Sequence, residues 1–391
     1  MPAVLSGHRA LLSRRQPPAF TSVPSWLQSY SASKTSRGAI QVNLIAISSS
    51  SCRYSSHSSH SSKSHTRPSS SAQPASSAIP STSSTATTSL AHDVNPPPST
   101  RPADLNQPDP ISPSASASDK LKRYVALGRA YVSFYKTGLK NVYHNYRASL
   151  PIRGSLGLPS YLPTSPPPAP PSSQNNAFRK AVESLNLSRS NFQLVRRAAY
   201  DVRRMVPFTL ILIICGELTP LAVLAFGTAV TPFTCRVPRQ VEKDRIQKAA
   251  RKRAALISHQ AKTLGSLTPF AVGSEQELDL LANDYVNPEW IETAAAEDIL
   301  RACAVLNLAK THTRPTLLTS VMYRPRLRRY AEYLSLDDQL IRSCGGVKAM
   351  EADEVRIAVD ERGGVELAEG KEGWEAERDE RRWLERWLER R

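Results

Sequence analysis

The chain has 391 residues, with 51 Lys or Arg against 34 Asp or Glu, so its formal net charge is +17. Its five cysteines form no C-x-x-C pair, which argues against a disulfide framework or a zinc site. The sequence also lacks a P-loop, a G-x-G-x-x-G loop, a G-x-S-x-G elbow, an H-E-x-x-H pair and an EF-hand loop. We therefore predict no enzyme, catalytic residue, cofactor, metal site or small-molecule substrate.

The N-terminal region is basic and contains no acidic residue before Asp93, while Ser dominates the first hundred residues. This composition is typical of an organelle transit peptide, and we predict a mitochondrial presequence over residues 1–54. A merely disordered tail is the alternative interpretation. Residues 55–118 are rich in Ser, Thr and Pro, and we expect them to be disordered because they cannot bury enough apolar area to offset chain entropy.

Residues 119–204 are predicted to be helical, with a Pro-rich linker between two helices. The first helix, about Asp119–Tyr146, carries aromatic side chains among Lys and Arg. Such a pattern could stack nucleobases, but a helix that packs on a partner or lies at a membrane surface is favoured. The linker spans Pro163 to Pro171 and is expected to be extended. The second helix is expected from about Ala177 up to the apolar run that begins at Met205, because apolar residues recur there every three or four positions.

Residues 205–235 form a long apolar run in which Glu217 is the only charged residue. About twenty apolar residues suffice to cross a bilayer, so we predict one transmembrane segment here. Pro207 and Pro220 are expected to kink it. A buried helical hairpin of a soluble protein is the alternative.

The residues that flank this run predict its orientation. Five Lys or Arg occur in the twenty residues before Met205, and eight occur in the twenty residues from Arg236. This bias favours a C-terminal part in the matrix and residues 119–204 on the intermembrane-space side.

Residues 236–391 are predicted to form a helical matrix domain. Ser274 and Glu277 read as a capping box, and Asn287-Pro288 reads as a helix start. The fold class expected for the whole chain is therefore all-α, as a single-pass membrane protein with a disordered N-terminal region. The expected C-terminal helices are Gln240–Gln260, Asn287–Leu308, Tyr323–Leu334, Leu336–Ser343, Asp353–Glu361 and Lys371–Arg391.

Several short motifs resemble the LETM family, which is named after leucine-zipper and EF-hand-containing transmembrane proteins. Around the apolar run these are Leu187-Ser-Arg189, Arg197, Asp201-Val-Arg-Arg204-Met-Val-Pro207-Phe208, Glu217, Pro220 and Thr231-Pro232-Phe233. Phe134–Asn141 and Cys235–Arg245 look like the fungal branch of that family. Near the C-terminus they are Leu336–Ile341, Gly345–Val347, Asp353–Val355, Glu361–Gly363 and the closing Trp383–Leu388.

The resemblance implies a single-pass protein of the mitochondrial inner membrane whose helical matrix domain binds mitochondrial ribosomes, with the large subunit as the expected partner. It also implies roles in membrane protein biogenesis and potassium/proton homeostasis. The chain lacks the EF-hand and the long coiled coil of the family, so calcium regulation is not implied.

Three functional interpretations follow. In the first, clustered cations contact the ribosome, and the candidates are Arg324, Arg326, Arg328, Arg329, Arg251, Lys252 and Arg253. In the second, Glu217 lies on the ion pathway of a cation/proton exchanger, because an ionisable residue within an apolar span is a functional candidate. A single span makes no pathway alone, so this interpretation requires a homo-oligomer among inner-membrane lipids. The third is a non-ribosomal scaffold of the inner membrane.

Overall fold

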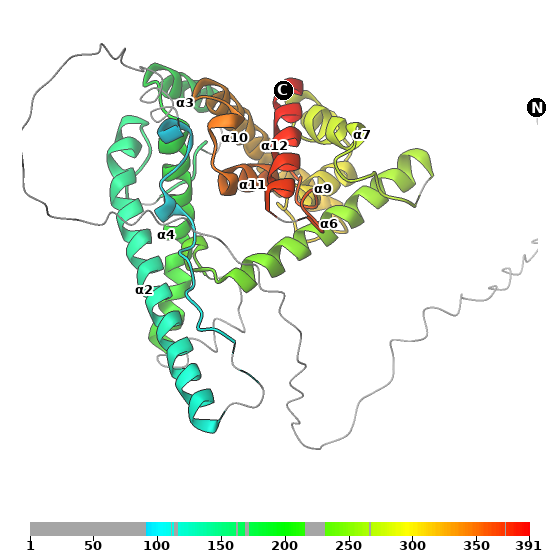
Figure 1. Ribbon diagram of the computed structural model, residues 1–391. Helices are drawn as coiled ribbons and strands as arrows, with labels where there is room; N and C mark the ends of the chain where they lie inside the picture. Colours follow the sequence, from blue (N-terminus) through cyan, green and yellow to red (C-terminus); the bar gives the residue numbers. More distant parts are fainter. Residues whose placement is uncertain are drawn as a thin grey trace, which may run out of the picture. The chain divides into compact units, whose positions relative to one another are not determined.

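The computed structural model describes residues 91–110, 112, 116–161, 163–168, 172–215, 231–265, 267–371 and 373–391. Within these ranges the chain forms helices and turns and no strand, so the prediction of an all-α fold is confirmed for the part described (Figure 1). The predicted presequence, residues 1–54, lies outside the described residues.

Two long helices, α2 (Ala117–Ser155) and α4 (Arg189–Cys215), lie side by side and run in opposite directions (Figure 1). The side chain of Ser116 caps α2 by accepting a hydrogen bond from the Asp119 amide. The short 3-10 turn η5 (Phe233–Cys235) packs on the same face of α2. Gly138 permits this close approach, because a Cβ atom there would lie 2.8 Å from the Cys235 sulfur.

The predicted second helix is two helices in the structure, α3 (Ser172–Ser184) and α4. The break falls at Asn186, whose φ of 44° lies in the left-handed region that ends helices. The Ser188 side chain then accepts a hydrogen bond from the Asn191 amide and so starts the next helix. Asn186 and Ser188 therefore end one helix and start the next within a stretch whose apolar repeat predicted a single helix.

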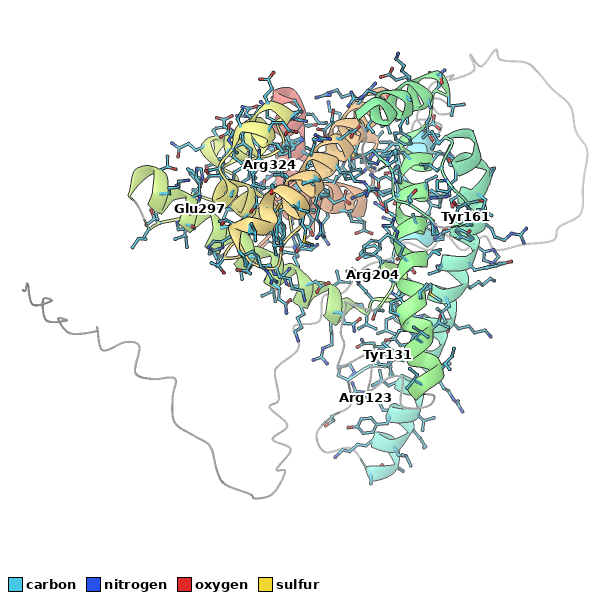
Figure 2. The ribbon with its side chains drawn as sticks, turned by 180° about the vertical axis from the view of Figure 1, so that it is seen from behind. Arg123, Tyr131, Tyr161, Arg204, Glu297 and Arg324 are labelled. Atoms are coloured by element: carbon cyan, nitrogen blue, oxygen red, sulfur yellow. The ribbon has the colours of Figure 1, made fainter. Side chains whose placement is uncertain are left out.

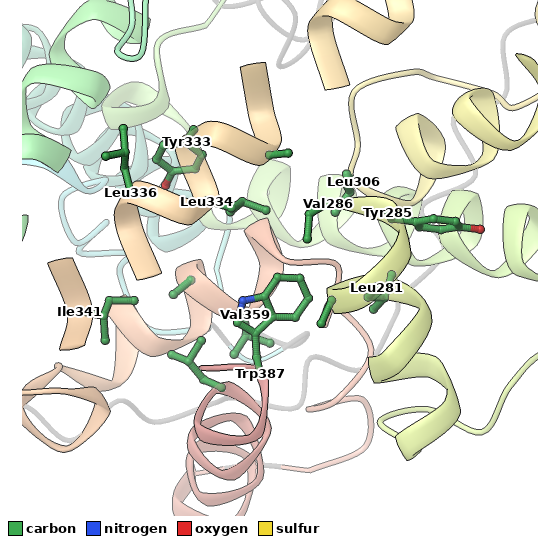
Figure 3. Packing of buried hydrophobic residues seen from close by; sticks show 14 of the residues in the cluster. Leu281, Tyr285, Val286, Leu306, Tyr333, Leu334, Leu336, Ile341, Val359 and Trp387 are labelled. Atoms are coloured by element: carbon green, nitrogen blue, oxygen red, sulfur yellow. The ribbon is translucent and has the colours of Figure 1, made fainter. Parts of the chain in front are cut away.

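The C-terminal half is a group of helices around one apolar core (Figure 3). Trp387, Leu281 and Val359 come from different helices and meet in this core with no exposed surface. The longest helix of the group, α6, packs against α9. The C-terminal helix α12 packs against α11 (Figure 1). The elements are α6 (Pro238–Leu264), α7 (Glu275–Asp279), η6 (Leu280–Tyr285), α8 (Pro288–Thr293), α9 (Ala296–Val305), η7 (Thr316–Leu318), η8 (Thr319–Tyr323), α10 (Arg324–Ser343), η9 (Val347–Ala349), α11 (Ala352–Glu361) and α12 (Gly373–Arg390).

The local signals at helix ends are confirmed more often than the helix lengths. Ser274 caps α7 through the Glu277 amide, and Asn287 caps α8 ahead of Pro288. The helix expected from Asn287 to Leu308 nevertheless divides into α8 and α9, and the two short helices expected between 323 and 343 are the single α10.

Part of the region predicted to be disordered, 55–118, is ordered. Val94 is completely buried, and the Asn95 side chain donates to the carbonyl of Ala349 at 2.9 Å and accepts from the amide of Glu351 at 2.8 Å. Arg101 forms an ion pair with Glu351 at 2.5 Å. The disorder prediction is therefore wrong for residues 91–101, because their partners lie about 250 residues away in sequence and local composition does not reveal them.

The structure does not support the expected single-pass arrangement. No helix among the described residues is both long enough and apolar enough to cross a membrane. Residues 77–391 form one compact unit, and α4 is joined to α10 by a buried ion pair between Arg189 and Asp337 at 2.9 Å. Residues 119–204 and 236–391 therefore pack together in this structure, within the ranges described.

The two described ends of the predicted span lie in that same body. Residues 205–215 continue α4, whereas residues 216–230 lie outside the described residues. The Phe233 amide donates to the Asp201 carboxylate at 2.6 Å. Cys215 lies about 21 Å further along the helix axis than Asp201, at 1.5 Å per residue. The two described ends of the run therefore lie at different levels of α4, with Cys215 at the end of the helix and Phe233 beside its middle.

Candidate functional site

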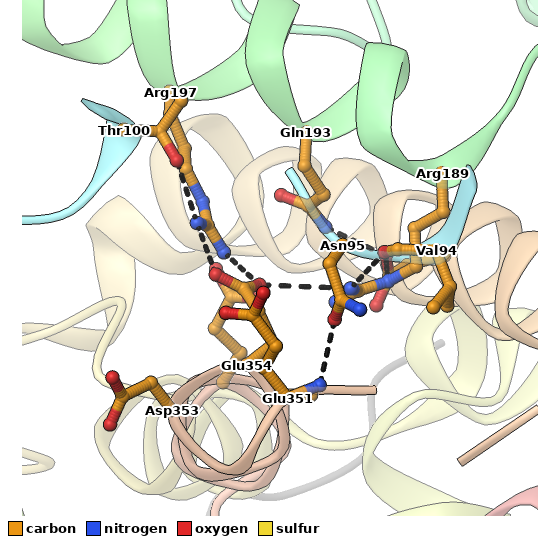
Figure 4. A network of polar contacts seen from close by, with 12 residues as sticks. Val94, Asn95, Thr100, Arg189, Gln193, Arg197, Glu351, Asp353 and Glu354 are labelled. Carbon is orange, nitrogen blue, oxygen red and sulfur yellow. Dashed lines mark hydrogen bonds and ion pairs between the residues drawn. The ribbon is translucent and has the colours of Figure 1, made fainter. Parts of the chain in front are cut away.

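A buried ionic network holds α4 in place against α10 and α11 (Figure 4). The Asp337 carboxylate accepts from Arg189 at 2.9 Å, from Gln193 at 2.7 Å and from Arg362 at 2.8 Å. Arg362 also donates to Asp338 at 2.6 Å. Arg189, Arg362 and Asp337 have no exposed surface, so each charge depends on its partners for stabilisation.

A second part of the network joins α4 to α11. Arg197 donates two hydrogen bonds of 2.8 Å to the two oxygens of Glu354, which is completely buried. Arg196 pairs with Glu361 at 2.8 Å, and the Arg196 guanidinium stacks on the Tyr333 ring. Paired geometry of this kind is specific as well as stabilising. The start of α4 is thus fixed to the C-terminal helices, which leaves only its far end to project.

Several residues of the short motifs named in the sequence analysis lie in this network. Arg189, Asp337, Asp338, Glu354 and Arg362 all lie in the quoted motifs, and the structure brings them together in one buried cluster. Their role in this structure is to join helices, and no opening to solvent leads to them among the residues described. In this structure these motif residues therefore hold the helices together.

The far end of α4 exposes apolar side chains to solvent. Ile213 and Ile214 are 73% and 80% exposed, and Val206 and Leu210 are also exposed. Figure 2 shows this end of the α2–α4 pair below Arg204, where it extends past Tyr131 and Arg123 of α2. Adjacent exposed apolar side chains are uncommon on monomeric soluble proteins and mark interaction surfaces. This end, Val206 to Ile214, is the candidate site.

Asp201 is a buried carboxylate near the middle of α4. It is 2% exposed and accepts from the Phe233 amide, and burial raises its pKa although that hydrogen bond lowers it. Phe208, about two helical turns further on, is the last buried apolar side chain of α4 among those described. Beyond it the helix carries Thr209, Leu210, Ile213 and Ile214 in exposed positions.

Three of the four arginines predicted to bind ribosomes at the start of α10 are engaged inside the protein. Arg324 donates to the carbonyls of Ile291, Glu292 and Ala294, which closes the end of α8. Arg328 pairs with Glu292 at 3.0 Å. Arg329 donates to the carbonyl of Pro167 at 2.7 Å and so holds the Pro-rich linker.

The cluster on α6 is divided in the same way. Lys252 is 1% exposed and forms ion pairs with Glu277 and Glu366, so it supports the core. Arg251 donates to Asn307 at 2.8 Å, and Arg253 pairs with Glu366 at 2.8 Å. Lys252 is therefore not available as a surface contact.

Arg326 is the member of the predicted set that remains exposed without an acidic partner among the described residues. Sequence reasoning missed Lys310 and Arg314, which are exposed in the connection between α9 and α10 that leads to Arg326. A sequence signal did exist, because both cations occur in a stretch of Thr and Pro without acidic residues, typical of an exposed loop.

The remaining predicted residues belong to the apolar run. Pro207 lies inside α4, which continues to Cys215. Glu217 and Pro220 lie outside the described residues, so their predicted roles in ion exchange and in kinking stay predictions. No group of His, Cys, Asp or Glu suited to a metal ion occurs within the described ranges.

These features define an all-helical protein whose buried ionic network leaves one apolar helix end exposed. The family model of the pentamidine resistance factor domain matches residues 119–343, from the first turn of α2 to the last residue of α10. That match covers more than half of the chain, which therefore belongs to the pentamidine resistance factor family. The likeness to the LETM family remains one of short motifs. Searches of curated proteins and of solved structures found no match.

Proposed function

We propose that this protein is attached to the mitochondrial inner membrane through the exposed end of α4, with its helical body in the matrix. There it serves as a docking platform in the biogenesis of membrane proteins, and the mitochondrial ribosome is its proposed partner. The basic, acid-free N-terminal region supports import into mitochondria.

The exposure of Leu210, Ile213 and Ile214 carries this proposal. Transfer of one such side chain from water to an apolar medium is favourable by about 1.5–3 kcal/mol. The next residues along the chain, up to Val230, are also predominantly apolar, so the apolar character of this segment continues in the sequence. A membrane is the partner that would cover a continuous apolar segment of this length.

Attachment from one side follows from the packing of both flanks. Arg189 before the apolar run and Arg245 after it belong to the same helical body, and Arg245 contacts Glu380 of α12 at 3.5 Å. Both flanks are basic, with five and eight Lys or Arg within twenty residues. A basic flank prefers the matrix side, so the two flanks agree on one location.

Alkaline carbonate extraction of mitochondria tests the attachment. We expect the wild-type protein to stay in the membrane pellet. The triple substitution Leu210→Ser, Ile213→Ser, Ile214→Ser should raise the extracted fraction, although residues 216–230 keep their apolar character. The matched control substitutes Leu317, Val321 and Met322, which are exposed apolar residues away from α4. Full extraction of the wild type would contradict attachment, and equal release of the control would remove α4 from it.

Ribosome binding is proposed to use the exposed cations Lys310, Arg314 and Arg326. We expect Arg326→Glu to reduce co-sedimentation with the large ribosomal subunit. The loss of affinity should be largest at low salt, because each lost phosphate contact lowers the steepness of log K against log salt concentration by about one. Lys180→Glu makes the same charge change on exposed α3 and serves as the control. Co-sedimentation that is insensitive both to salt and to Arg326→Glu would count against the ribosome as partner.

A further inference from the structure

The outer face of α2 carries two parallel rows of exposed side chains. The apolar row is Leu121, Val125 and Val132. At 100° per residue these three project within about 40° of arc on the helix surface. The row lies apart from the face that α2 buries, which Phe134, Gly138 and Val142 form.

A basic row runs beside it. Lys122, Arg129 and Lys136 are spaced seven residues apart, and Lys140 falls on the same side of the helix. The centre of this row is about 60° from the centre of the apolar row. All four cations are exposed.

Most of this positive charge is not neutralised by the protein. Asp119 is the one acidic residue of α2, and it lies 3.8 Å from Lys122. Arg129, Lys136 and Lys140 have no ion pair with any described residue. Exposed Tyr143 projects in the same direction as Val125, and exposed Tyr124 lies about 60° from Leu121 on the side away from the basic row. Tyrosine is a residue type enriched at membrane–water interfaces.

We propose that this face of α2 binds a lipid surface that contains anionic phospholipids. The apolar row enters the boundary between headgroups and acyl chains, and the basic row contacts the phosphates, as in other interfacial amphipathic helices. The charge complementarity selects anionic lipid over a second copy of this chain, whose own face would present the same cations. The inference rests on the membrane attachment proposed for α4, and it names the lipid class that the protein recognises.

The basic row also constrains how the protein meets the membrane. A Lys or Arg at the centre of a bilayer costs about 2.5–3.5 kcal/mol on insertion scales. Lys122 and Arg129 are sequence neighbours of Arg123 and Tyr131, which Figure 2 shows in the part of α2 beyond Arg204, toward the exposed end of α4. The axis of α2 therefore stays near the membrane plane.

Flotation of the full-length protein with vesicles tests the proposal. One vesicle set contains phosphatidylcholine alone, and the other also contains phosphatidylglycerol. We expect stronger binding to the anionic set. The triple substitution Lys122→Gln, Arg129→Gln, Lys136→Gln should weaken that binding on the order of 100-fold, at about a factor of five per cation. The control is Lys180→Gln, Lys348→Gln, Arg382→Gln, which removes the same charge at exposed positions elsewhere and should leave vesicle binding unchanged.

The other outcomes overturn the proposal. Unchanged vesicle binding of the α2 variant would overturn it. An equal loss of binding in the control variant would also overturn it, because binding would then depend on the net charge of the protein and not on the face of α2. If the α2 variant loses self-association but keeps vesicle binding, this face of α2 binds a second copy of the chain instead of lipid. The triple substitution Leu210→Ser, Ile213→Ser, Ile214→Ser should reduce binding to both vesicle sets and keep the preference for anionic lipid. If the protein resists carbonate extraction but shows no preference for anionic vesicles, only the lipid-binding role of α2 is refuted. If the protein is extracted by carbonate but still prefers anionic vesicles, only the membrane attachment through α4 is refuted.

Discussion

Cysteines introduced at Lys180 and at Lys348 are expected to react from the same side of the inner membrane. Lys180 is exposed on α3, before the apolar run, and Lys348 is exposed after α10, beyond it. In intact mitoplasts a membrane-impermeant maleimide should label neither position, and after permeabilisation it should label both. A single crossing at residues 205–235 would instead expose position 180 alone in mitoplasts.

The reason for this expectation is the packing between the two halves. Arg179 of α3 donates to Ser335 of α10 at 3.2 Å, and Gln339 of α10 donates to Glu183 of α3 at 3.3 Å. A bilayer cannot lie between groups in direct contact. The outcome is therefore nearly all-or-none, which makes labelling a sharp measurement.

The native cysteines allow a low background. Cys235, Cys303 and Cys344 are buried, and burial raises the pKa of Cys235 and of Cys303 to about 12, so little reactive thiolate is present at neutral pH. Cys52 and Cys215 would be replaced by Ser in the parent protein. Labelling of Lys180→Cys in intact mitoplasts while Lys348→Cys stays protected would contradict the one-sided arrangement.

Periodicity and end signals were sufficient for much of the helical fold. The α6, α11 and α12 helices were predicted close to their observed bounds, because each carries its own start signal or apolar repeat. Trp383 and Trp387 lie four residues apart on the buried face of α12, as a helical period requires. Local patterns succeed where the deciding interaction lies within one or two helical turns.

The same patterns were insufficient for the charged residues. A run of Lys and Arg looks alike whether its members are solvated or buried, and the difference lies in partners far away in sequence. Buried Lys252 forms ion pairs with Glu277 and Glu366, and buried Arg189 forms one with Asp337. None of these partners is close in sequence. Lys252, one of the predicted ribosome contacts, is therefore buried, whereas the exposed apolar end of α4 lies in the run predicted to meet a membrane.

Loss of the Asp337 carboxylate should produce the largest change in stability. Asp337→Ala leaves Arg189 and Arg362 buried with fewer acceptors, and removal of one partner from a buried ion pair costs about 3–5 kcal/mol. Denaturant unfolding followed by the fluorescence of buried Trp383 and Trp387 would measure this loss. Asp353→Ala is the control, because its side chain is 50% exposed and its pair with Arg101 should contribute less than about 1 kcal/mol.

A double substitution separates the ion pair from simple loss of packing. Asp337→Leu combined with Arg189→Met replaces opposite buried charges with apolar groups, and such replacements are often close to neutral. The double variant should therefore be more stable than Asp337→Leu alone. If the two variants unfold at the same denaturant concentration, the pairing between Asp337 and Arg189 does not govern the effect.

The pH dependence of stability supplies an independent check, with Asp337→Asn as the variant. Burial alone would raise the pKa of Asp337, but the charges of Arg189 and Arg362 hold it well below its usual range. A carboxylate whose pKa falls on folding adds stability above its unfolded pKa of about 3.9, and this contribution is lost as the pH falls through the lower folded value. The difference in unfolding free energy between the wild type and Asp337→Asn should thus be full at pH 6 and shrink at acid pH. A difference that stays constant over this acid range would mean that Asp337 contributes through shape and neutral hydrogen bonds, and that its charge does not join α4 to α10.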